Sequence, residues 1–323
     1  MNILLLPNYT LHAPTPADVP EVLALLAASD TADYGEANTT DPEEVQRWWV
    51  REETTLVRDA AGHLIAYYSL SADDPTHYYS EVFVHPDQRG QGLEGAILDR
   101  LEARARERLA DSPVTAQWLL ESGIGRHSVV MRAALAEHSY GYIRTFWRMR
   151  IDLTAPPPTP EWPQGIILRT YQPGTDDRAV YDAVETAFAD HWNWHATPFE
   201  EWIERTQRPN FDPALWLLAM DGTAIAGAAL GTKELTKGWI NKVAVPRAYR
   251  KRGIAKALLY QAFGAFWQRD VRRVELGVDA ESLTGAQRLY EQVGMHPVME
   301  YDLFQKELRA ASPPDPEPRM QEL

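Results

Sequence analysis

The chain of 323 residues contains no cysteine. This absence excludes disulfide bonds, thiolate metal sites and a cysteine nucleophile. Two histidines, His191 and His195, stand four residues apart in the stretch "HWNWH", a spacing that suits zinc when both lie on one helix. No third ligand follows at a recognisable spacing, so we expect no metal site.

Positive charge is scarce. The chain has 32 Lys and Arg against 46 Asp and Glu, which gives a net charge of −14. Nucleic acids and anionic membranes are therefore poor candidates for partners. An acidic surface suits a cationic or neutral acceptor, although acidity is also a common route to solubility.

Long apolar runs are also absent. The beginning, "MNILLLPNYTLHAPTP", has a short apolar run and no basic residues before it. No stretch approaches the roughly 20 apolar residues that a membrane span needs. We expect neither a signal peptide nor a membrane span, and hence a soluble cytoplasmic protein.

The length suits two domains of about 150 residues each. A proline-rich stretch, "TAPPPTPEWPQG", divides the chain nearly in half and is typical of a stiff extended linker. We expect an N-terminal domain at 8–153, the linker at 154–165, a C-terminal domain at 166–308 and a loose tail at 309–323.

The two halves resemble each other. The stretches "TTLVRDAAGHLIAYYSL" and "LWLLAMDGTAIAGAALG" both predict a hairpin, and the strand-like runs "EVFV" and "NKVAV" follow. Amphipathic helices are expected at 92–108 and 254–269. The glycine turns before them lie 161 residues apart, with Arg89 and Gly92 in register with Arg250 and Gly253. We interpret this as a tandem duplication of one α/β unit.

The turn in the second half has the features of an anion site. It lies between a strand and a helix, where free backbone amides and the helix dipole favour phosphate. Gly253 permits close approach of the backbone, and Ala255 adds little bulk. The cationic residues of the turn are Arg250, Lys251, Arg252 and Lys256.

A resemblance to a known family rests on two segments. "VAVPRAYRKRGIAKALLYQAF" resembles the acyl-CoA-binding segment of the Gcn5-related N-acetyltransferases (GNAT), with its Arg/Gln-x-x-Gly-x-Gly/Ala signature. "LGVDAESLTGAQRLYEQVGMHPV" is similar to the family's second signature. The resemblance covers 166–308 well and 8–153 less well. The tandem layout is similar to that of mycothiol synthases and related two-domain acetyltransferases.

The resemblance implies an α/β fold of two tandem GNAT domains, each a mixed, mostly antiparallel sheet flanked by helices. It implies an N-acetyltransferase that uses acetyl-CoA, with direct attack by a primary amine in the C-terminal domain. The amine acceptor stays unidentified: a small molecule is expected, and a small amine, an antibiotic, an amino sugar, an amino acid and a protein N-terminus are all open. The oligomeric state is also left open. The alternative is a non-catalytic acyl-CoA-binding or regulatory protein.

The resemblance also implies site residues. Ser282 stands where the family often has asparagine, although a helix N-cap role suits it equally. Tyr290 would donate a proton to the departing thiolate, and the competing interpretation is a packed core aromatic. The pantetheine arm would pair with Val243, Ala244 and Val245. The pyrophosphate would be held by Arg250, Lys251, Arg252, Gly253, Ile254, Ala255 and Lys256.

The general base is left open. The family often has a glutamate where this chain has Trp239, so the base is sought among Glu234, Asp279, His191 and His195, directly or through water. Alternatively, the amine arrives already neutral. Trp192 and Trp194 are acceptor-site candidates, or else part of an aromatic loop on the core.

The first half departs from the signature. Its turn, "RGQGLEG", places Glu94 where the second half has Ala255. A carboxylate at ~4 Å from a phosphate costs roughly 1–4 kcal/mol, depending on the effective dielectric. In the first half, the position equivalent to Tyr290 is occupied by Ala136 or Glu137, depending on the alignment. We therefore expect a degenerate N-terminal copy, unless Glu94 swings away and the turn still holds the coenzyme. Asp33 and Glu36 are expected on a solvated loop.

Overall fold

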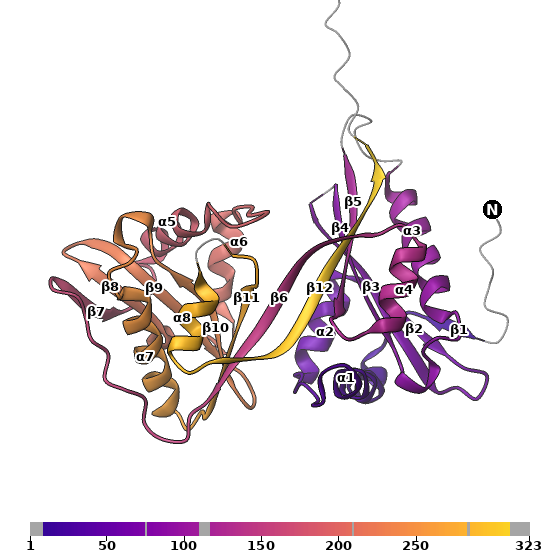
Figure 1. The fold of residues 1–323 in the computed structure, drawn as a ribbon, viewed down its shortest axis with the longest axis horizontal. Helices are drawn as coiled ribbons and strands as arrows, with labels where there is room; N and C mark the ends of the chain where they lie inside the picture. Colours follow the sequence, from indigo (N-terminus) through magenta and orange to yellow (C-terminus); the bar gives the residue numbers. More distant parts are fainter. Residues whose placement is uncertain (1–8, 75, 110–116, 209, 283–284, 311–323) are drawn as a thin grey trace, which may run out of the picture. The chain divides into compact units, whose positions relative to one another are not determined.

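A computed structural model describes residues 9–310, apart from residues 75, 110–116, 209 and 283–284. The chain divides into two compact units. Unit 1 extends to Thr145 and includes the chain from Tyr301 onward, and unit 2 is Phe146–Glu300. Each unit is an α/β layer structure with its own hydrophobic cores (Figure 1).

Unit 1 has a mixed sheet in the order β1-β2-β3-β4-β5-β12. All its pairings are antiparallel except that of β4 with β5. Helices α1 and α2 pack on one face through the core around Leu56 and Tyr67, and α3 and α4 pack on the other. The elements are β1 Thr10–His12, η1 Pro16–Asp18, α1 Val19–Tyr34, α2 Pro42–Arg51, β2 Glu53–Arg58, β3 Leu64–Asp74, β4 His77–Val84, η2 Pro86–Gln88, α3 Leu93–Leu109, β5 Trp118–Gly125, α4 Val129–Glu137 and β12 His296–Arg309.

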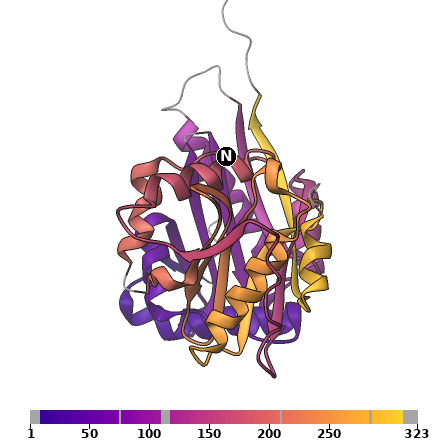
Figure 2. The same ribbon diagram turned by 90° about the vertical axis from the view of Figure 1, so that its left-hand side faces the viewer.

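Unit 2 repeats this plan, with strand order β6-β11-β10-β9-β8-β7 and one parallel pairing, β10 with β11. Helices α5 and α6 cover one face, and α7 covers the other (Figure 2). The expected α/β class, with a mixed, mostly antiparallel sheet between helices, is confirmed. The elements are β6 Gly141–Asp152, β7 Ile166–Thr170, α5 Asp177–Phe188, α6 Phe199–Glu204, η3 Arg205–Gln207, η4 Pro213–Leu215, β8 Trp216–Asp221, β9 Ala224–Lys233, β10 Gly238–Ala244, η5 Arg247–Tyr249, α7 Ile254–Trp267, β11 Arg273–Asp279 and α8 Ala286–Gln292.

The duplication extends to backbone conformation. Three successive elements begin 161 residues apart: β4 and β10 at 77 and 238, η2 and η5 at 86 and 247, and α3 and α7 at 93 and 254. Gly92 and Gly253 both have φ 87°, and Gly90 and Lys251, also 161 apart, have φ 75° and 62°. The two turns therefore have nearly the same shape, and their side chains make the difference.

The last strand of each copy joins the sheet of the other unit. Strand β6 follows α4 of unit 1, yet its residues 146–152 pair with β11. Strand β12 follows α8 of unit 2, yet its residues 301–309 pair with β5. The sequence-based boundaries differ from this division, because they placed 146–153 in the first domain and 301–308 in the second.

The expected linker has no helix or strand between Asp152 and Ile166, and it lies on unit 2. Leu153 is buried in the core of unit 2, where its amide donates to the Arg272 carbonyl at 2.6 Å, and Trp162 packs on the same core. The expected tail lies outside the described residues beyond Ala310. In the described chain, no helix is both long and apolar enough to cross a bilayer.

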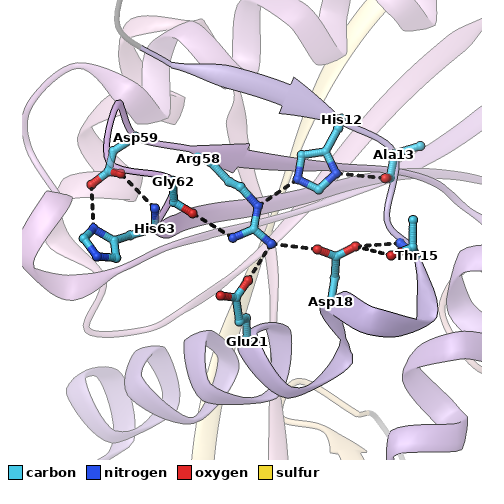
Figure 3. Close-up of polar contacts among 9 residues, drawn as sticks. All are labelled: His12, Ala13, Thr15, Asp18, Glu21, Arg58, Asp59, Gly62 and His63. Atoms are coloured by element: carbon cyan, nitrogen blue, oxygen red, sulfur yellow. Dashed lines mark hydrogen bonds and ion pairs between the residues drawn. The ribbon is translucent and has the colours of Figure 1, made fainter.

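Arg58 on β2 ties the beginning of the chain to the sheet of unit 1 (Figure 3). Its guanidinium donates to Asp18 at 2.6 Å, to His12 Nε2 at 3.0 Å and to the Gly62 carbonyl at 2.9 Å, and it pairs with Glu21 at 2.5 Å. Burial opposes ionisation of Asp18, yet hydrogen bonds from Thr15 and Arg58 lower its pKa overall. This network fixes α1 against the β2–β3 hairpin.

Candidate functional site

The glycine turn of unit 2 forms an open, cationic helix start. Gly253 is the N-cap of α7, and the amide of Ala257 donates to its carbonyl at 3.0 Å. The amides before Ala257 precede the helical hydrogen-bond ladder and are available to an anion. The side chains of Lys251, Arg252 and Lys256 are exposed around them. A Cβ placed on Gly253 would meet nothing within 4 Å, so the turn leaves free space.

Arg250 has a different place from the other cations. Its guanidinium donates to the Val245 carbonyl at 3.0 Å and to the Ala187 carbonyl at 2.9 Å, and it pairs with Asp190 at 3.3 Å. These contacts join the end of β10, the end of α5 and the turn. Arg250 therefore positions the turn from inside unit 2, and contact with a pyrophosphate stays a prediction for it.

Arg89 makes the equivalent contacts in unit 1. It donates to the Val84 carbonyl at 3.1 Å and to Ser29 at 2.7 Å, and it pairs with Asp33 at 2.6 Å. The expectation that Asp33 lies on a solvated loop is wrong. Asp33 belongs to the last turn of α1, and its side chain is only 13% exposed because Arg89 draws it against the turn.

Glu94 occupies the corresponding turn of unit 1. Its side chain is folded inward, since the residue is 3% exposed, and its Oε1 accepts a hydrogen bond from the Gly90 amide at 3.2 Å. A carboxylate thus takes the place at the helix start that favours an anion. In unit 2, Ala255 leaves the same place open.

Strands β10 and β11 diverge next to the turn. Their parallel pairing includes Gly238 and Trp239 of β10, and among the described residues it goes no further. On the other side of β10, the register with β9 shifts between Ile240 and Lys242. Such a bulge re-aims the strand and its side chains. Val243 and Ala244 follow it, on an edge that β11 no longer covers.

The first unit lacks this bulge. Strand β4 pairs with β3 in unbroken register from Tyr78 to Val84, and its parallel pairing with β5 extends to Ser80. The strand geometry and the turn therefore both distinguish unit 2 from unit 1.

Tyr290 lies on α8, is 8% exposed and belongs to the main core of unit 2. Burial raises its pKa to about 12. The phenol is therefore protonated throughout the physiological range, and it is a weaker acid than an ordinary tyrosine. This buried position agrees with the interpretation of Tyr290 as a packed core aromatic. Its role as a proton donor stays a prediction.

Ser282 lines a pocket of about 450 Å³ in unit 2. The pocket brings the loop after β11 together with α8 and with Trp147 of β6. The expected N-cap role of Ser282 is wrong, since the N-cap of α8 is Gly285. The other lining residues are Gly285, Gln287, Arg288 and Glu291.

Lys242, which sequence reasoning missed, lies at the bulge. Its Nζ is 4.6 Å from the ring centres of both Phe188 and Trp194. Burial, helped by the nearby charge of Arg205, lowers its pKa to about 8, and Glu185 opposes the shift. The signal that could have found it is a single charged residue within the apolar strand "WINKVAV".

The structure separates the four candidate bases. His191 lies near Lys242, Asp279 and Arg250, and burial followed by the charge of Lys242 lowers its pKa. Asp279 ends β11, at the side where the strands diverge. Glu234 lies before the other end of β10, beside Lys237, and His195 is exposed.

The histidine pair does not have the helical geometry that its spacing suggested. Helix α5 ends at Phe188, and the stretch from His191 to His195 is not helical. Trp194 instead donates to Glu185 at 2.9 Å, and Trp192 lies against Phe146 with 6.5 Å between ring centres. No group of three or more metal-ligating side chains occurs in the part of the chain that the structure describes.

Comparison with known proteins agrees with this geometry. The family model described as "Acetyltransferase (GNAT) family" matches residues 23–117 and 178–295. Mycothiol acetyltransferase of Thermobispora bispora is 32% identical over 310 residues, covering 87% of this chain and 93% of the relative. The Salinispora arenicola protein of the same name is 34% identical, covering 86% and 90%.

Two solved structures share the whole layout. A GCN5-related N-acetyltransferase from Sphaerobacter thermophilus is 40% identical, with a TM-score of 0.86 over 94% of this chain and 97% of that one. A tandem GNAT protein from the clavulanic acid biosynthesis pathway, at 16% identity, shares the fold with a TM-score of 0.70 over 94% and 100%. The two matched regions, the duplicated sheets and these relatives confirm the resemblance: the chain belongs to the GNAT acetyltransferase family, as a tandem N-acetyltransferase.

Proposed function

We propose that unit 2 transfers the acetyl group of acetyl-CoA to a primary amine of a small acceptor, and that unit 1 does not bind the coenzyme. The observation that carries this proposal is the contrast at the two turns. Ala255 leaves the start of α7 open among exposed cations, whereas Glu94 fills the start of α3 with its own carboxylate.

The residues of unit 2 fit the parts of acetyl-CoA. The open helix start with Lys251, Arg252 and Lys256 suits a pyrophosphate. The uncovered edge of β10 at Val243 and Ala244 offers backbone groups to the pantetheine amides. The pocket beside Ser282 would take a further part of the coenzyme.

Acetyl-CoA supplies an activated thioester, whose carbonyl carbon the acceptor amine attacks. The C–N bond forms and the C–S bond breaks, so one proton must leave the amine and one must reach the sulfur. A backbone amide near Val243 would stabilise the charge that develops on the carbonyl oxygen. Tyr290 would hydrogen-bond to the departing sulfur and give it a proton.

For the proton on the amine, we assign His191 as the base. Its lowered pKa keeps the imidazole neutral at physiological pH, and the charges of Lys242 and Asp279 act on it from β10 and β11. Lys242 beside it would disfavour a second positive charge, so the acceptor amine would be held in its neutral form. An acceptor that also carries an anionic or hydroxyl group would suit Lys242.

The amines to be tested as acceptors are chosen from the charges at the site and from the names of the relatives. It should include the amine form of mycothiol that lacks its acetyl group, an amino sugar and an amino acid. Release of free thiol from acetyl-CoA gives the rate, and isothermal titration gives the stoichiometry. We expect one coenzyme per chain and turnover with at least one amine.

Variants assign the chemistry. Tyr290→Phe and His191→Gln should each lower kcat by roughly 100- to 10,000-fold without changing the affinity for acetyl-CoA. His195→Gln is the matched control, since this histidine is exposed. Binding without turnover on any amine, or two coenzymes per chain, would contradict the proposal.

A further inference from the structure

Unit 1 has a group of polar residues that the proposed transfer does not use. Strand register places Thr54, Ser69 and Glu81 side by side across β2, β3 and β4. Strand side chains alternate between faces, so these three share the face of Leu56, Tyr67 and Phe83, on which α1 and α2 pack. The polar row therefore lies immediately beside the apolar core under these helices.

Glu52 extends this row. It is the C-cap of α2 and has an extended backbone, with φ −117° and ψ 144°, directly before β2. Its side chain therefore points to the same side as those of Thr54 and Leu56. On the other side of the row, Tyr79 stands opposite Ser71 on β3. Two carboxylates and two phenols thus meet on one small area of the sheet.

Several buried polar atoms in this group have no hydrogen-bond partner among the described residues. They are the hydroxyl of Tyr67, a residue that is 0% exposed, the hydroxyl of Thr54, which is 7% exposed, and Oε2 of Glu52. Thr54 and Ser69 lie close enough to Tyr67 to lower its pKa, although the Tyr67 hydroxyl makes no hydrogen bond of normal geometry with a described residue. Buried polar atoms are almost always satisfied in native proteins, so this group calls for a ligand or ordered water.

The electrostatics indicate the sign of that ligand. Neither Glu52 nor Glu81 forms an ion pair with a cationic side chain in the described chain. Burial and the charge of Glu52 raise the pKa of Glu81 to about 7, and burial raises that of Glu52. Burial raises the pKa of Tyr67, and the charges of Glu81 and Glu52 raise it further, against the opposing effect of Thr54. Two carboxylates held together without a cation favour a positively charged ligand.

We propose that Glu52, Glu81, Tyr67 and Thr54 form a binding site for a small primary ammonium compound. An ammonium group has three N–H donors, which match two carboxylates and a hydroxyl oxygen. A metal ion fits less well, because the described residues contain no cluster of three or more acidic or histidine side chains. The aromatic rings of Tyr67 and Phe83, 5.9 Å apart, would border the carbon part of the ligand.

The site is specific to unit 1. The position 161 residues after Glu81 is Lys242, so the duplicated strand carries the opposite charge in unit 2. The two copies have kept one half-buried charged position on the same strand and have reversed its sign. A cationic ligand that is favoured beside Glu81 is therefore disfavoured beside Lys242. The proposed site lies in unit 1 and does not depend on acetyl transfer in unit 2.

The test uses the full chain without acetyl-CoA, in an amine-free phosphate buffer at about pH 8, where the carboxylates are ionised. The probe is ethanolamine hydrochloride, followed by ligand-observed NMR and isothermal titration. We expect saturable binding of one molecule per chain. Ethylene glycol, which is neutral, should not bind, and choline, which has no N–H, should bind at least about tenfold more weakly.

Variants locate the binding. Glu81→Gln should weaken binding at least about tenfold, because it removes the charge and keeps the shape. Glu53→Gln, one residue from Glu52 and paired with Arg104, is the matched control, and it should leave ethanolamine binding unchanged. If Glu81→Gln fails to fold, Tyr67→Phe removes only the hydroxyl and should weaken binding by several-fold. Absence of saturable binding, equal binding of ethylene glycol, or full binding by Glu81→Gln or by a folded Tyr67→Phe overturns the proposal.

Discussion

The carboxylate of Glu94 accepts a hydrogen bond from the amide of Gly90, 3.2 Å away, at the turn where its duplicate has Ala255 and Lys251. The two turns have the same backbone shape, so one side chain decides whether the helix start is open to an outside anion.

Transferring this carboxylate to unit 2 should therefore close the second turn. Ala255→Glu should lower acetyl-CoA affinity about 10- to several-hundredfold, because the carboxylate competes with the pyrophosphate and repels it. Isothermal titration measures the loss. Gln261→Glu adds the same charge two turns along α7 and should leave the affinity within about twofold. Equal losses for the two variants would show a general charge effect and not a blocked turn.

We expect the two arginines of the turn, Arg250 and Arg252, to differ in role: one stabilises the fold and the other binds the coenzyme. Arg252→Ala should weaken acetyl-CoA binding about tenfold and reduce its salt dependence, without changing stability, because this side chain is exposed. Arg250→Ala should instead lower the free energy of unfolding by about 1–3 kcal/mol, because it leaves the Val245 and Ala187 carbonyls without their donor. Urea unfolding and titration of both variants check this. An Arg250→Ala protein of unchanged stability would contradict the positioning role.

The raised pKa of Glu81 predicts a pH-dependent stability. Burial and Glu52 raise this pKa from 4.5 to about 7, so the folded chain holds a proton that the unfolded chain releases. The contribution of Glu81 to stability therefore falls as pH rises from about 4.5 to about 7, and it stays low above that. Glu81→Gln should be more stable than the parent by about 1–3 kcal/mol at pH 8 and nearly equal at pH 5.

Glu53 provides the opposite case on the neighbouring residue. Burial opposes ionisation, but hydrogen bonds from Arg104 and Arg108 lower its pKa. Glu53→Gln should therefore destabilise the protein at pH 8 and lose that effect at acidic pH. If both glutamine variants responded to pH in the same direction, the environment of Glu81 would not be the one described.

The Arg58 network should contribute more to the free energy of unfolding than the surface ion pairs of unit 1. Arg58→Ala removes the guanidinium from Asp18, whose side chain is only 11% exposed, and should cost about 2–4 kcal/mol in urea unfolding. Arg104→Ala breaks a pair in which both side chains are at least 40% exposed, and should cost about 0–1 kcal/mol. A similar cost for both would mean that Arg58 does not anchor α1.

Much of the fold follows from local patterns in the sequence. Both hairpins, the helices after the glycine turns and the fixed offset between copies were predicted, because alternation, turn residues and repeat spacing are local signals. The exchange of β6 and β12 was missed, because a half-buried strand such as "FWRMRI" fits either of two similar sheets. Nothing in its own sequence selects the partner.

The site was predicted less completely than the fold. The open turn is formed by residues that are adjacent in the sequence, so Gly253 and Ala255 were sufficient to predict it. The partners of Arg250 lie on α5 and directly after β10, and those of Lys242 lie on α5 and in the loop after it. Such contacts between distant segments have no spacing in the sequence, so the positioning role of Arg250 and the presence of Lys242 were not predicted.

The crossing of β6 and β12 has a genetic consequence. A cut in the proline-rich stretch would give two fragments, each bearing a strand that its counterpart needs and missing one of its own. Each half of the coding sequence therefore supplies a strand to the product of the other half, which favours keeping both in one reading frame. Separating them for study requires rerouting the chain by circular permutation, so that each sheet recovers its own final strand.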